Sequence, residues 1–89
     1  MVKITHVRFK NGKEHENIVA FYCFDTTTGE TISVTKENMI KFINQRPNTV
    51  FVEDSKGLVE VFVIDDNPKY LRTKKDGRPT NNLLNLPEF

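Results

Sequence analysis

Residues 81–87 of this 89-residue chain read Asn-Asn-Leu-Leu-Asn-Leu-Pro, and this stretch decides how the fold is completed. It has neither the period of a helix nor the alternation of a strand. Asn side chains both donate and accept hydrogen bonds, so they can fix an irregular backbone segment in place. We therefore expect a tail that is clamped onto the body of the domain. The residues of this structural clamp are Asn81, Asn82, Leu83, Leu84, Leu86 and Pro87.

Two segments upstream indicate why such a cover is needed. Residues 18–24 and 58–64 are apolar at nearly every position, which is typical of strands that are buried on both faces. Residues 36–45 place their apolar side chains at helical spacing, between a Thr35 N-cap and the helix-ending Pro47. A helix of this length spans about 15 Å and covers one face of a sheet. The second face must be covered by the tail, by a sheet that coils onto itself, or by a partner subunit.

The remaining patterns predict an α+β fold with an antiparallel sheet of four to five strands. Further strands are expected at residues 2–10, 31–34 and 50–54. Residues 70–73, at the start of the tail, are a candidate for a short edge strand, and a basic loop is expected over residues 74–79. The order along the chain is β-β-β-α-β-β, with one short helix on one face and the C-terminal tail packed on the body.

Turn chemistry supports this order. Asn11-Gly12, residues 55–57 and Asp76-Gly77 are turn signals. In the first strand the apolar residues change parity near Thr5 and His6, which indicates either a bulge or burial on both faces.

Length and composition indicate a single domain over residues 1–89, with residues 70–89 as a structured tail. The formal net charge of +1 gives no overall attraction to nucleic acid or to an anionic membrane. The lone Cys23 cannot form an intramolecular disulfide and is expected to be a buried small hydrophobe, as suits a reducing compartment. No segment is apolar over the ~18 residues that a membrane span needs, and the first residues lack the apolar core of a signal peptide. We therefore expect a cytoplasmic protein that does not enter a membrane.

No constellation of residues predicts catalysis, a metal site or a cofactor. His6, His15 and Cys23 lack the paired spacing of zinc ligands, and His15 is expected to be a solvated loop residue. Cys23 lies in the middle of an apolar run with no activating His nearby. The carboxylate pairs at 53–54 and 65–66 stand at strand ends, where Asp commonly forms turns. The sequence therefore predicts a protein that is not an enzyme.

One basic segment, residues 69–78, is a candidate ligand surface. Its cations could neutralise phosphates and its tyrosine could stack on a base. The competing interpretation is a solvated segment that keeps an edge strand from pairing with other chains. The candidate residues are Lys69, Tyr70, Arg72, Lys74, Lys75 and Arg78.

The tail also carries a family resemblance. Tyr-Leu-Arg-Thr at residues 70–73, a basic turn with Asp76-Gly77, and Asn-Leu-Leu-Asn-Leu-Pro at residues 82–87 together resemble a small bacterial and phage family, domain of unknown function 3892. The Ile-Thr-His-Val-Arg segment at 4–8 and the Ser-Val-Thr-Lys-Glu segment at 33–37 agree with it. The resemblance implies a fold over most of the chain and assigns no activity and no catalytic or binding residue.

Two functions are compatible with these observations. The first is a non-enzymatic binding module that acts on a protein partner or associates with itself, which suits the surplus apolar face and the small size. The second is binding of nucleic acid or of an anionic ligand through residues 69–78.

Overall fold

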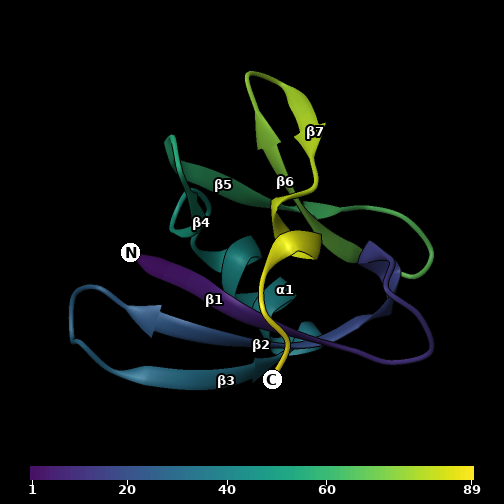
Figure 1. Cartoon of the computed structure of the whole chain (residues 1–89), viewed down its shortest axis with the longest axis horizontal. Helices are drawn as coiled ribbons and strands as arrows, with labels where there is room; N and C mark the ends of the chain where they lie inside the picture. The colour runs from purple at the N-terminus through teal and green to yellow at the C-terminus, as the bar shows by residue number, and fades with distance from the viewer.

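The computed structural model describes residues 1–89 and folds them into one seven-stranded sheet with a single α-helix (Figure 1). The strands are β1 (Val2–Phe9), β2 (Ile18–Asp25), β3 (Thr31–Thr35), β4 (Val50–Asp54), β5 (Gly57–Ile64), β6 (Tyr70–Lys75) and β7 (Arg78–Thr80). The helix is α1 (Lys36–Gln45), and two short 3-10 turns are η1 (His15–Asn17) and η2 (Asn82–Asn85). No helix combines the length and the apolar character that crossing a membrane requires.

The strands lie side by side in the order β3-β2-β1-β4-β5-β6-β7. Neighbours are antiparallel except β1 and β4, which are parallel. The predicted α+β class and the mostly antiparallel sheet are confirmed, whereas the predicted count of four to five strands is too low. The predicted helix over 36–45 is confirmed, and the Thr35 hydroxyl accepts a hydrogen bond from the Asn38 amide at 3.3 Å, as an N-cap does.

The largest difference from the sequence prediction lies at residues 70–80. Residues 70–73 do not form an edge strand, because β6 pairs with β5 on one side and with β7 on the other. Asp76 and Gly77 both have positive φ, at 54° and 76°, and fold the chain into a tight hairpin. The predicted basic loop at 74–79 is therefore mostly a β-hairpin, and the sheet has β3 and β7 as its edges.

A bulge in β1 explains the parity change near Thr5. The register against β2 shifts between Ile4 and His6, so that Ile4 and Val7 both face the core, with exposures of 1% and 0%. On its other side β1 pairs with β4 only through Val2 and Lys3. Beyond Lys3 the two strands are no longer paired, and the edge of β1 is left open.

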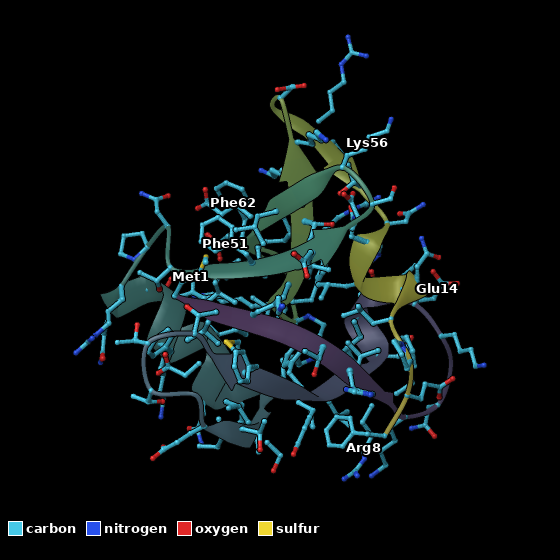
Figure 2. All side chains as sticks on the ribbon, turned by 60° about the vertical axis from the view of Figure 1, so that its left-hand side comes forward. Met1, Arg8, Glu14, Phe51, Lys56 and Phe62 are labelled. Atoms are coloured by element: carbon cyan, nitrogen blue, oxygen red, sulfur yellow. The ribbon has the colours of Figure 1, made fainter.

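The C-terminal tail fills this opening. The Val7 amide donates to the carbonyl oxygen of Pro87 at 3.0 Å, and the Phe89 amide donates to the carbonyl oxygen of Val7 at 3.1 Å. Arg8 lies beside the end of the tail (Figure 2), where its guanidinium stacks 4.3 Å from the centroid of the Phe89 ring. Leu83 is completely buried in the hydrophobic core, and Leu84 and Leu86 pack against that core.

The sheet coils around α1. The helix contacts β2 and β3 in one half of the sheet and β5 and β6 in the other (Figure 1). Its buried Met39 and Ile43 belong to the same hydrophobic cluster as Ile4, Leu71 and the tail residue Leu83. The sequence left three possible covers for the second face of the sheet. Two of them are present, because the coiled sheet and the tail enclose the core together with the helix.

Removal of the tail should destabilise the domain. Truncation after Thr80 deletes the Leu83 side chain from the core and leaves the backbone groups of Val7 without partners, so we expect it to unfold the chain or to drive it into dimers. The substitution Leu83→Ala should cost roughly 3 kcal/mol of unfolding free energy. Urea unfolding and size-exclusion chromatography measure both effects.

Leu58→Ala is the matched control, because Leu58 on β5 is 45% exposed and its truncation should change stability by less than about 0.5 kcal/mol. A truncated chain that stays monomeric and melts at the temperature of the full chain would contradict the covering role of the tail.

Candidate functional site

The six basic-segment residues do not form one surface. Alternate residues of a strand face opposite sides, so Tyr70, Arg72 and Lys74 share one face of β6. The buried Leu71 and Thr73 occupy the other face.

Three of the cations have partners within the chain. Arg72 donates from Nε to the carbonyl oxygen of Thr80 at 3.3 Å and from Nη2 to Oδ1 of Asn81 at 3.0 Å. The Lys74 ammonium lies 5.3 Å from the centroid of the Phe62 ring. Lys69 Nζ is 3.8 Å from a carboxylate oxygen of Asp65, in an exposed ion pair.

Phe62 shares the outer side of the sheet with a second phenylalanine. Phe51 on β4 and Phe62 on β5 project to the same side (Figure 2), where both are half-buried. Lys75 and Arg78 flank the hairpin turn, are exposed and make no hydrogen bond or ion pair through their side chains. The cations that remain free for a ligand are thus these two at the hairpin tip.

The tail asparagines join the tail to two strands. Asn82 donates from Nδ2 to Oδ2 of Asp54 at 3.0 Å and accepts from the Thr73 hydroxyl at 3.4 Å. The backbone amide of Lys56 donates to Oδ1 of Asp54, and this bond, together with that from Asn82, holds the pKa of the Asp54 carboxyl below its usual range. The β4–β5 turn is in this way connected to the last segment of the chain.

His15 is not the solvated loop residue that the sequence predicted. It lies in η1, which packs against β6, and only 6% of the residue is exposed. Its ring centroid is 6.4 Å from that of Tyr70, and Nε2 has no hydrogen-bond partner. Burial, reinforced by the nearby Arg72 guanidinium, lowers the pKa of His15 below 6.5.

At the opposite edge of the sheet, β3 is an open strand. It pairs with β2 alone, and four of its five residues are exposed. Alternate residues of such an edge direct their N–H and C=O groups away from the sheet. Ile32 is 57% exposed, which is the largest exposure of any bulky apolar residue in the chain.

A cavity of about 590 Å³ lies beside this edge, between β3, α1 and the start of β1. Ile32 and Val34 stand opposite the buried Cys23 and Phe21 of β2, so they face the side on which the cavity lies. Half of the lining residues are hydrophobic, and the apolar part of the lining includes Val2, Cys23, Ile32, Val34, Met39 and Phe42.

The cavity has an apolar interior and a polar rim. Burial raises the pKa of the Cys23 thiol to about 12, so this thiol stays protonated and forms part of the apolar wall. The lining also contains one acidic residue, Asp25, and one basic residue, Arg46. An apolar side chain of a ligand fits such a site.

Sequence reasoning missed this site because its lining comes from four distant segments. One local signal was present: residues 31–35 alternate Thr-Ile-Ser-Val-Thr, so the strand before the helix is apolar on one face only. That pattern is typical of a strand with one solvated side.

The low pKa of His15 predicts a loss of stability in mild acid. The unfolded chain binds the proton more tightly than the folded chain, so the contribution of neutral His15 is complete above pH 6.5 and is lost as the pH falls below that value toward the lowered pKa. The urea midpoint should therefore be lower at pH 5 than at pH 7.5.

His15→Gln should weaken this dependence, because the amide does not titrate. An unchanged pH dependence in His15→Gln would show that another group is responsible.

Searches among curated proteins and among solved structures found no match. A family model described as protein of unknown function (DUF3892) matches residues 3–87. This range includes nearly the whole of the sheet, the helix and the tail motif on which the resemblance rests. The chain therefore belongs to the DUF3892 family.

Proposed function

We propose that the chain is a non-enzymatic, cytoplasmic protein-binding module that takes up an extended polypeptide segment as a further strand beside β3. The observation that carries this proposal is the position of the apolar cavity directly beside an open sheet edge. An edge strand supplies backbone hydrogen bonds to an incoming strand, and pockets along it select side chains.

The two edges of the sheet differ in a way that supports this choice. At the other edge, β7 has three residues, contains Pro79, and begins with the free cation of Arg78, which lies opposite the free cation of Lys75 on β6. Short length, proline and positive charge are devices that keep an edge strand from pairing. β3 has no proline, and its register with β2 is continuous over five residues.

The geometry also indicates what the bound segment looks like. Side chains of an added strand alternate between the two faces of the sheet. Those on one face would meet Ile32, Val34 and the cavity, and those on the other face would meet the hydroxyl groups of Thr31 and Ser33. The bound segment should therefore alternate apolar and polar residues.

The alternative function, binding of nucleic acid or an anionic ligand through residues 69–78, has less support. Arg72, Lys74 and Lys69 are engaged within the chain, which leaves Lys75 and Arg78 as the free cations of this segment. Two cations release few counterions from a polyanion, so they give weak binding at physiological salt.

Peptide selection tests the proposed function. A library of random peptides displayed on phage and selected against the wild-type protein should enrich segments with alternating apolar residues. Ile32→Lys should abolish binding of the enriched peptides, because it places a charge on the open edge at a position that is already exposed.

Leu58→Lys introduces the same charge at an exposed apolar residue of a strand far from β3 in the sheet order, and it should leave binding unchanged. The proposal fails if no peptide is enriched, or if the enriched peptides bind Ile32→Lys as well as wild type.

Fluorescence anisotropy with labelled single-stranded DNA tests the alternative. A protein-binding module should give no binding that strengthens as the salt concentration is lowered. Binding with a steep salt dependence that is lost in Lys75→Glu/Arg78→Glu would instead favour the basic hairpin.

A further inference from the structure

We infer that the strand taken up at this edge is β3 of a second copy of the chain, so that two molecules join through β3 into one continuous sheet. This inference rests on the proposed strand addition and names its partner. It is carried by the pattern of residues along the open edge and by the charges at the two ends of β3.

The sequence of the edge is self-complementary. Residues 30–36 read Glu-Thr-Ile-Ser-Val-Thr-Lys, which is nearly symmetric about Ser33. When two such strands pair antiparallel with Ser33 opposite Ser33, Thr31 of one copy faces Thr35 of the other. Ile32 in turn faces Val34 of the second copy, so every pair joins residues of like character.

The charges at the ends of the strand favour the same register. Glu30 directly precedes β3 and Lys36, the first residue of α1, directly follows it. In this register Glu30 of each copy would lie beside Lys36 of the other, so the contact would contain two pairs of opposite charge at its ends, and such pairs are stabilising. The Lys36 ammonium donates to the carbonyl oxygen of Glu16 at 3.2 Å and keeps two further N–H donors for a carboxylate.

Neighbouring registers lose this match. In one alternative register, in which the faces of the strands stay aligned, Ile32 lies opposite Ile32 and Glu30 lies opposite Val34. In the alternative register shifted in the opposite direction, Lys36 lies opposite Ile32. Both put a charge against an apolar side chain, so the charge pattern selects the register that is centred on Ser33.

The paired strands would also connect the two cavities. Ile32 and Val34 face the cavity side in each molecule, so the dimer gathers four apolar side chains into a stripe that runs from one cavity to the other. Pairing in this way covers Ile32, which is 57% exposed in the single chain. The hydroxyl groups of Thr31, Ser33 and Thr35 lie on the opposite face.

The contact is small, because each copy contributes a strand of five residues. Interfaces below the standard size are mostly weak and transient. We therefore expect a reversible dimer whose population rises with protein concentration, related by a twofold axis through Ser33.

Charge exchange gives a sharp test by sedimentation velocity across a wide range of protein concentration. Glu30→Lys and Lys36→Glu should each be monomeric where the wild type is dimeric, because each places two pairs of like charge in the interface. Mixed together, the two variants should form a heterodimer. Both end charges of the first variant are positive and both end charges of the second are negative, so each cross-strand pair again joins opposite charges. The double variant Glu30→Lys/Lys36→Glu should dimerise as wild type does.

Glu14→Lys is the control for Glu30→Lys, because it makes the same change in net charge at an exposed residue in the loop before η1 (Figure 2) and should not alter the dimer. A wild-type dimer that Glu30→Lys leaves intact, or a mixture of the single variants that stays monomeric, would overturn the inference.

Disulfide trapping reports the register independently. Residues directly opposite in antiparallel strands have Cα atoms about 4.5–5.5 Å apart, which lies within the range that a disulfide bridges. Ser33→Cys should therefore form a covalent dimer on oxidation, as seen on a non-reducing gel, while the native Cys23 is fully buried and does not compete. Ser55→Cys, in the β4–β5 turn, should stay monomeric.

The outcomes separate this inference from the proposed function. A wild type that is monomeric at every concentration, but binds selected peptides in a manner sensitive to Ile32→Lys, removes the second copy as the partner and keeps the strand addition. A monomer that binds no selected peptide removes both.

Discussion

The pairing of β1 with β4 ends after Val2 and Lys3, and the rest of the structure depends on how the opening beyond it is filled. Both backbone groups of the buried Val7 point into this opening, and a buried amide or carbonyl without a partner is costly. The tail supplies those partners and inserts Leu83 into the core behind them. Without the tail, β1 would have an unpaired edge in the middle of the sheet, and the core around α1 would be uncovered on one side.

Local signals predicted the parts of the fold that local physics determines. Thr35 and Pro47 predicted the limits of the helix, because a cap and a missing N–H act within one turn of the chain. The adjacency of β1 and β4 was not predictable in this way, because no pattern within either strand records which distant strand lies next to it. The three residues of β7 also escaped prediction, since a strand containing Pro79 is too short to show alternation.

The candidate site illustrates the same limit. The residues at 69–78 are close in sequence, yet strand alternation separates them and Asn81, Thr80 and Phe62 engage several of them. The cavity beside β3 is built from residues spread between Met1 and Thr49, among them Val2 and Phe42, and the coil of the sheet brings them together. Closeness along the chain therefore suggested one surface where the fold separates the residues, whereas the cavity beside β3 is assembled from several segments.

The difference between the two edges of the sheet also limits how far the molecule can polymerise. A sheet that accepts strands at both edges can grow without end, as fibrils do. Here β7 is short and carries Pro79, so the sheet can be extended on the β3 side alone. Growth by the proposed strand addition would therefore stop after a single step, and it would leave a closed particle of defined size in place of a filament.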